Sequence, residues 1–108
     1  MKHIVVVLTE PTEGREADYN DYYENLHLDE VLSTTIMTSA QRFKLTDQQG
    51  AKCPLPYLAL YEVEADDPKE VLANLNATRS ERVQSDALNK RTAGAWVFSE
   101  IGPRHERD

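Results

Sequence analysis

Cysteine is nearly absent from this chain, which contains only Cys53. A single cysteine excludes an intrachain disulfide, and it cannot form a zinc site without several histidines. The three histidines, His3, His27 and His105, lie far apart in the sequence. We therefore expect no metal site.

Long hydrophobic runs are also missing. The apolar run near the start, Ile4–Leu8, is followed by Thr-Glu-Pro and is too short for a signal peptide or a membrane span. The lone cysteine fits a reducing compartment. These features predict a cytoplasmic protein that has no membrane partner.

Basic residues are outnumbered, with 12 Lys and Arg against 19 Asp and Glu, for a net charge of -7. Nucleic-acid binding needs a basic face, so this balance argues against a nucleic-acid partner. The 108 residues suffice for one core but not for two. We expect one domain over residues 1–103, followed by a mobile charged tail over residues 104–108.

No Gly-rich phosphate loop, nucleotide-binding fingerprint or Gly-x-Ser-x-Gly elbow occurs. The sequence therefore indicates no cofactor. Haem stays open on these grounds, because one axial histidine would be enough to bind it.

Apolar and β-branched runs predict four strands. They cover Lys2–Leu8, Ile36–Thr46, a third run that opens at Pro56 or Tyr57 and continues to Glu64, and Gly94–Ile101. The first and third runs are apolar on both faces, which is typical of strands buried on both sides. In the second run, alternation places Arg42 and Phe43 on opposite faces.

A first helix is expected to begin near Glu16–Asp18, because acidic side chains suit a helix N-terminus. Its aromatic face carries Tyr19, Tyr22, Tyr23 and Leu26 at helical spacing. Leu28 and Leu32 fall on the opposite side, so we expect a break near Leu28 and a short second turn to Ser33.

The segment Asp66-Asp67-Pro68-Lys69-Glu70 predicts a second helix, with Asp67 as N-cap, Pro68 at the first helical position and Glu70 in a capping box. Its predicted face is Val71, Leu72, Leu75 and Arg79. Residues 80–92 are polar and only weakly helical in pattern.

The order strand, helix, strand, strand, helix, strand predicts an α+β, ferredoxin-like βαββαβ antiparallel sheet with both helices on one face. Two helices cover only one face of such a sheet, whereas two strands are apolar on both. Packing of the uncovered face against a second copy would bury the exposed patch, which favours a homodimer.

Two segments resemble the EthD-type branch of the dimeric α/β-barrel superfamily. They are GREADYNDYYENLH, from Gly14 to His27, and SAQRF, from Ser39 to Phe43. The resemblance implies a dimer whose two sheets form a barrel, with a small-molecule cavity in each subunit. Superfamily members include cofactor-free monooxygenases, polyketide cyclases and dehydratases, and haem-dependent enzymes.

Three positions depart from the family pattern. Tyr22 stands where relatives usually carry Trp, Asp29 where they often carry Pro, and Thr35-Ile36 where they carry Pro-Gly. The first departure alters the wall of the implied cavity. The other two alter the turn after the helix, beside His27.

His27 is the first candidate for catalysis, since an imidazole titrates near neutral pH and suits a general acid or base. The alternative is a structural histidine bonded to a backbone carbonyl, Asp29 or Glu30. Tyr22 could position or protonate a ligand, and Arg42 could stabilise a carboxylate or enolate oxygen or instead form a salt bridge across the dimer.

Aromatic side chains supply the candidates for ligand binding, although packing in the core is their commoner role. The candidates are Tyr19, Tyr23, Phe43, Tyr57, Tyr61 and Trp96. Trp96 and Phe98 share a strand face, and we expect both to pack beneath a helix.

Two functions from different classes remain open. The first is a cofactor-free enzyme of the lyase, cyclase, dehydratase or monooxygenase type, acting on an aromatic or polyketide-like small molecule. The second is a binding or accessory protein with the same pocket and no turnover. A His27 ring that opens into a cavity favours the enzyme, and a ring with both nitrogens bonded internally contradicts it.

Overall fold

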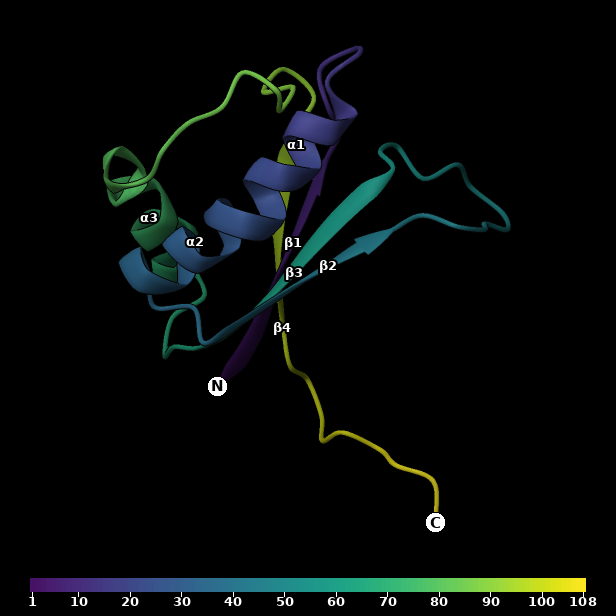
Figure 1. Cartoon of the computed structure of the whole chain (residues 1–108). Helices are drawn as coiled ribbons and strands as arrows, with labels where there is room; N and C mark the ends of the chain where they lie inside the picture. The colour runs from purple at the N-terminus through teal and green to yellow at the C-terminus, as the bar shows by residue number, and fades with distance from the viewer.

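The computed structural model describes residues 1–108 and shows an α+β fold in which helices lie against one antiparallel sheet (Figure 1). The helical elements are α1 (Glu16–Tyr22), the π-helical turn η1 (Tyr23–His27), α2 (Leu28–Thr34), α3 (Lys69–Ala77) and the 3₁₀ turn η2 (Arg79–Glu81). The strands are β1 (Lys2–Thr9), β2 (Ser39–Lys44), β3 (Tyr57–Glu64) and β4 (Gly94–Ser99). None of the helices has the length and apolarity needed to span a membrane.

The four strands have the order β2-β3-β1-β4, and every neighbouring pair is antiparallel. The chain order and this strand order are compatible with the expected ferredoxin-like fold. The two strands that are apolar on both faces, β1 and β3, occupy the centre of the sheet. They pair along their full length, from Lys2 opposite Glu64 to Thr9 opposite Tyr57.

Two strands are shorter than the sequence pattern predicted. β2 covers Ser39–Lys44 rather than Ile36–Thr46, and β4 ends at Ser99 rather than at Ile101. The Ile36 backbone N–H donates to the Asn74 side chain, 2.9 Å away, instead of pairing with a strand. A tertiary hydrogen bond thus ends the pattern that the residue types alone would continue.

One face of the sheet is buried beneath the helices. Paired residues of antiparallel strands point to the same side, and this face carries Val5 of β1 opposite Tyr61 of β3. Both side chains are buried, as are the facing helical residues Tyr23 and Val31. These residues belong to one hydrophobic core, which lies between sheet and helices.

The other face of the sheet is apolar and uncovered. The register places Val6 between Leu60 and Trp96, and Phe43 opposite Leu58. Phe43 and Trp96 are each 46% exposed, and Phe98 is 55% exposed. The expectation that Trp96 and Phe98 pack beneath a helix is therefore wrong. Their strand, β4, turns them to the side that carries no helix.

The expected break near Leu28 takes the form of a π-helical turn, and the backbone stays helical through it. A π turn accommodates one more residue than an α turn, so it changes which positions share a face. Buried positions follow at steps of four, five and three residues. They are Tyr19, Tyr23, Leu28 and Val31. The five-residue step crosses η1 and brings both halves of the segment onto the core.

The start of α3 agrees in part with the expected capping box. The Asp67 carboxylate accepts a hydrogen bond from the Lys69 backbone N–H at 2.9 Å, and Pro68 already has helical dihedral angles. Glu70 makes no side-chain hydrogen bond back to Asp67. The acidic residue before the proline therefore caps the helix without the reciprocal contact.

The weakly helical pattern of residues 80–92 corresponds to the short turn η2 and an irregular segment. This segment is held against the loop after β1. The Thr12 N–H donates to the Ala87 carbonyl at 2.6 Å, and the Asn89 N–H donates to the Glu10 carbonyl at 3.0 Å. Residues 82–93 therefore cross from η2 to β4 beside the helix layer. Residues 104–108 are exposed and have no regular structure.

Candidate active and ligand-binding site

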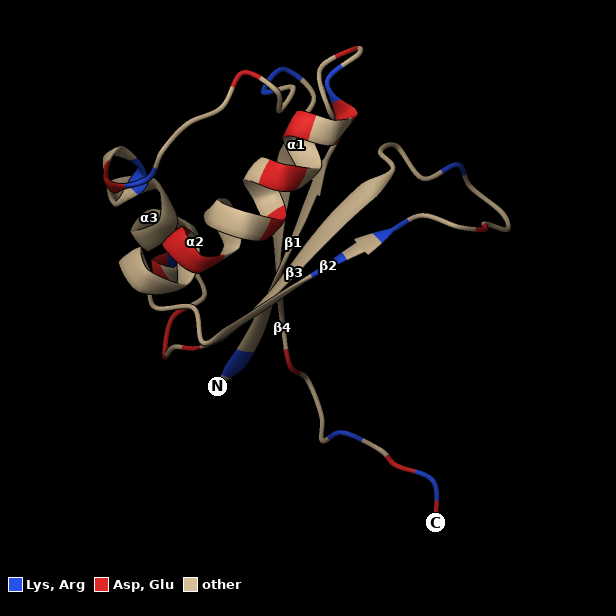
Figure 2. Cartoon of the chain, in the orientation of Figure 1, with Lys and Arg blue, Asp and Glu red and all other residues tan.

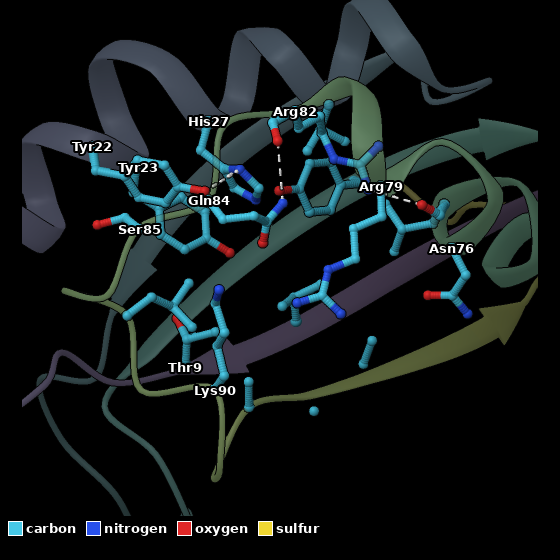
Figure 3. A pocket seen from close by; sticks show the side chains of 18 residues that line it. Thr9, Tyr22, Tyr23, His27, Asn76, Arg79, Arg82, Gln84, Ser85 and Lys90 are labelled. Atoms are coloured by element: carbon cyan, nitrogen blue, oxygen red, sulfur yellow. Dashed lines mark hydrogen bonds between the residues drawn. The ribbon is translucent and has the colours of Figure 1, made fainter.

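A cavity of about 350 Å³ lies between the sheet and the helices (Figure 3). Its floor comes from β1, β3 and β4, through residues such as Val7, Tyr61 and Ala95. One wall comes from the α1–η1–α2 segment and another from the end of α3. Residues 79–93 complete the site. A cavity of this size, half apolar in its lining, suits a small organic molecule.

His27 lies on η1 and lines this cavity. Its ring stacks on the Tyr22 ring, with centroids 5.1 Å apart and an interplanar angle of 26°. It meets Tyr23 edge to face, with centroids 4.9 Å apart. The histidine is thus held in one orientation by two aromatic neighbours that also line the cavity.

The hydrogen bonds around His27 define which ring nitrogen carries the proton. The Tyr22 hydroxyl donates to the Val83 carbonyl at 2.8 Å, and its oxygen lies 3.0 Å from His27 Nδ1. A hydroxyl has one hydrogen, so the Tyr22 oxygen must accept from Nδ1–H. In the neutral ring, Nε2 then carries a lone pair. No protein group hydrogen-bonds to Nε2 in this structure.

The environment of His27 keeps the ring neutral. The pKa of His27 is lowered to about 4, mainly by burial and also by the positive charge of Arg82, while Glu30 opposes the shift. Desolvation disfavours the charged form of an imidazole, and a neighbouring cation acts in the same direction. At neutral pH, His27 therefore presents an unprotonated Nε2 that can accept a proton or a hydrogen bond.

The tyrosines of the cavity keep their protons. Burial raises the pKa values of Tyr22 and Tyr23, and it raises the pKa of Tyr61 to about 12. Neutral phenols can donate a hydrogen bond, and their rings offer flat apolar surface. Of the candidate residues from the sequence, the structure brings His27, Tyr22, Tyr23 and Tyr61 to one cavity.

Arg42 does not line this cavity, although it lies on the helix-covered face of β2. Its guanidinium lies over three rings, with centroid distances of 5.3 Å to Tyr19, 4.8 Å to Tyr23 and 5.4 Å to Tyr57. It donates to Asn20 Oδ1 at 2.7 Å and pairs with Glu24 at 3.2 Å within the same chain. Its partners thus tie β2 to the first helix.

The remaining aromatic candidates also lie away from the cavity. Tyr19 and Tyr57 are buried beside Arg42, and the Tyr19 hydroxyl is hydrogen-bonded to Thr9. Phe43 and Trp96 lie on the uncovered face of the sheet. The structure therefore separates the sequence candidates into a cavity group, an arginine-centred group and an outer-face group.

Seven polar residues of the cavity were not singled out as site candidates from the sequence. They are Thr9, Asn76, Arg79, Arg82, Gln84, Ser85 and Lys90. The last five come from the segment between α3 and β4, whose polar pattern resembles that of an ordinary surface loop. One feature of the sequence could have indicated a basic site here, because residues 79–92 contain four basic residues in a chain of net charge -7.

His3 gives a useful contrast to His27. It is fully buried, and both of its ring nitrogens are bonded, Nδ1 to Ser99 at 2.7 Å and Nε2 to the Ala65 carbonyl at 3.0 Å. The chain has no group of three or more His, Cys, Asp or Glu side chains placed to hold a metal ion. His27 is the one histidine at the cavity and so the only one there that could ligate a cofactor.

Comparisons of the chain with protein-family models, with curated proteins and with solved structures found no match. The functional argument therefore starts from the geometry of the cavity and the residues that line it.

Proposed function

We propose that this protein is a cofactor-free enzyme that binds an aromatic or polyketide-like small molecule and uses His27 as a general base. The observation that carries the proposal is the pairing of His27 Nδ1 with the Tyr22 hydroxyl, which leaves Nε2 with a free lone pair at a cavity of about 350 Å³. A base needs an unprotonated atom, a fixed direction and room for a substrate. His27 has all three.

The chemistry begins with transfer of a substrate proton to His27 Nε2. The Nδ1–H bond to Tyr22 holds the ring as it becomes an imidazolium. Abstraction of a proton next to a carbonyl is a first step in lyase, cyclase and dehydratase reactions, and deprotonation of a phenol precedes oxygen insertion. The three tyrosine rings at the cavity supply flat surface for an aromatic substrate.

The proposal includes assembly into a homodimer of the EthD type, with the outer faces of two sheets packed into a barrel. The residues that resemble that family, such as Gly14, Asn20 and His27, support it, and so does the uncovered apolar face around Trp96. Exposed apolar patches of this kind on small proteins commonly mark interaction surfaces. A second copy offers the same apolar surface in return.

A second candidate function is ligand binding without turnover, in an accessory role. The low pKa of His27, about 4, favours it, because a base is most effective when its pKa lies near the working pH. In this case Nε2 accepts a hydrogen bond from a ligand hydroxyl and no proton is transferred.

The test compares the unmodified protein with His27→Gln, using His105→Gln in the exposed tail as the matched control. Phenols and β-keto aromatic compounds are screened for binding by thermal shift and for turnover by chromatography. The enzyme proposal predicts turnover that His27→Gln reduces by about a hundredfold or more, the scale of general-base catalysis, while the control retains it. Binding to both proteins with turnover in neither would support the accessory function instead.

A further inference from the structure

The cavity is basic although the chain is acidic. Three cations line it, Arg79, Arg82 and Lys90, and none of its lining residues is Asp or Glu. Elsewhere the acidic residues dominate, for example along the exposed sides of α1 and α2 (Figure 2). The net charge of -7 makes a local group of three cations without a carboxylate unexpected.

Arg82 is the strongest single indication. Its side chain is 7% exposed and forms no ion pair. The guanidinium donates to the hydroxyls of Thr34 and Thr78 and to the Leu75 carbonyl, at 2.8 to 3.0 Å. Its Nε is buried and has no hydrogen-bond partner. A buried cation without an ion-pair partner is costly, because its loss of hydration is only partly offset.

One neighbouring feature does offset part of this charge. Arg82 lies at the C-terminal end of α3, where the helix dipole contributes roughly half a negative charge. That partial charge is too small to balance a whole guanidinium. A carboxylate is also near, since Glu30 accepts a hydrogen bond from the Val83 N–H at 3.0 Å and acts on His27. The three lining cations outnumber this one carboxylate, so positive charge prevails at the cavity.

Arg79 and Lys90 point into the cavity from the two ends of the segment between α3 and β4 (Figure 3). Arg79 begins η2, and Lys90 comes shortly before β4. Neither forms an ion pair. By contrast, Arg15 pairs with Asp18 and Asp86.

We propose that the cavity binds a small aromatic or conjugated acid whose carboxylate lies among Arg79, Arg82 and Lys90. The ring of this acid packs against Tyr22, Tyr23 and Tyr61. The inference rests on the proposed function in one respect: it specifies the class of small molecule that the same cavity binds. A carboxylate on an apolar body fits better than a phosphate, since the site has no glycine-rich backbone loop and the lining is half apolar.

The experiment compares aromatic acids with neutral amides of the same shape. Benzoate, 2-hydroxybenzoate, cinnamate and 2-naphthoate are each titrated beside the corresponding amide by isothermal calorimetry. The proteins are the unmodified chain, Arg79→Gln, Lys90→Gln and the control Lys52→Gln, which removes one positive charge away from the cavity. Arg82 is left intact because it also holds the end of α3.

At least one acid should bind the unmodified protein about tenfold or more tightly than its amide, since hydrogen bonds to charged groups are the stronger ones. Arg79→Gln and Lys90→Gln should each weaken that acid by about two- to fivefold, the range for exposed ion pairs, without changing the amide. Lys52→Gln should change neither.

Three results would overturn the inference: no acid in the panel binds, acid and amide bind equally, or Lys52→Gln weakens the acid as much as the cavity variants do. Repeating the titrations with His27→Gln separates this inference from the proposed catalysis. If His27→Gln still prefers the acid and no variant shows turnover, the proposed ligand class is supported and the proposed enzymatic activity is contradicted. Turnover of neutral substrates without a preference for acids would support the enzymatic activity and contradict the proposed ligand class.

Discussion

The Tyr22 hydroxyl lies 3.0 Å from His27 Nδ1 and donates its own hydrogen to the Val83 carbonyl. This pair joins the first helical segment to the loop before β4 and sets the proton position on the imidazole. The resemblance to the EthD-type branch leads us to expect Trp rather than Tyr at position 22. An indole N–H can only donate, so a Trp could not accept from Nδ1–H while donating to Val83.

Replacement of Tyr22 by Phe keeps the stacked ring and removes the hydroxyl. We expect the free energy of unfolding to fall by about 1 kcal/mol, because His27 Nδ1–H and the Val83 carbonyl each lose a hydrogen-bond partner. In ¹⁵N spectra at neutral pH, unmodified His27 should show a protonated Nδ1 and an unprotonated Nε2, whereas the variant should show a mixture. Tyr57→Phe is the control, since its hydroxyl has only a long 3.4 Å contact from Asn20. An unchanged His27 spectrum in Tyr22→Phe would contradict the assignment.

Stability should depend on pH through His27. The pKa of His27 is about 4 in the folded chain, against an ordinary value of 6.5. Between these values the unfolded chain binds a proton that the folded chain does not. As pH falls from about 6.5 to about 4, protonation therefore favours unfolding by an amount on the order of 2 to 3 kcal/mol, and above pH 6.5 it has no effect.

Denaturant unfolding of the unmodified protein and His27→Gln at half-unit pH steps measures this contribution. The carboxylates titrate in both proteins, so the difference between them isolates His27 and its interactions with Arg82 and Glu30. The stability of the unmodified protein relative to His27→Gln should decline through the acidic window. A constant difference from pH 7 to pH 4 would show that burial does not shift this imidazole.

Replacement of Arg42 by Gln should lower stability and leave ligand binding intact. The change removes the guanidinium from three tyrosine rings and from Glu24 and Asn20. We expect a loss of about 2 kcal/mol in the free energy of unfolding. Lys44→Gln, on the same strand face but exposed, should cost about 0.5 kcal/mol or less. Lost affinity without lost stability would instead place Arg42 at the ligand.

Replacement of Trp96 by Glu tests the proposed dimer. The unmodified chain should sediment as two copies of the 12.3 kDa polypeptide at micromolar concentration. A charge on the apolar face, at the edge strand β4, should weaken association about thirtyfold or more, as expected for an aromatic anchor of an interface. Leu26→Glu is the control, because Leu26 is 38% exposed on the helix layer. A monomeric unmodified protein, or equal effects of both changes, would contradict the proposed interface.

Helical spacing placed Tyr22, Tyr23 and His27 together because they are close in the sequence and share one helical segment. The expected break near Leu28 pointed to the correct place, since the hydrophobic pattern changes face there. Its form, a π-helical turn, depends on burial of both Tyr23 and Leu28 against the same sheet. Periodicity along one segment carries no information about that shared partner.

Cavity residues that come from segments far apart in the chain were not predicted from the sequence. Arg79, Arg82 and Lys90 reach the cavity because residues 82–93 are bonded to the loop after β1, through contacts such as Thr12 with Ala87. Trp96 was assigned to the wrong side because alternation separates two faces without saying which one the helices cover. Arg42 was placed correctly opposite Phe43, but its tyrosine partners come from β3 and the first helix.

The sequence by itself determined the α+β element order, the two strands that are apolar on both faces and the aromatic face beside His27. Each of these follows from the residue pattern within one segment, where local geometry decides which side chains are neighbours. Only the tertiary structure decided the proton position on His27, the separation of Arg42 from the cavity and the basic character of that cavity. Each of these depends on contacts between segments far apart in the chain, which no local spacing encodes.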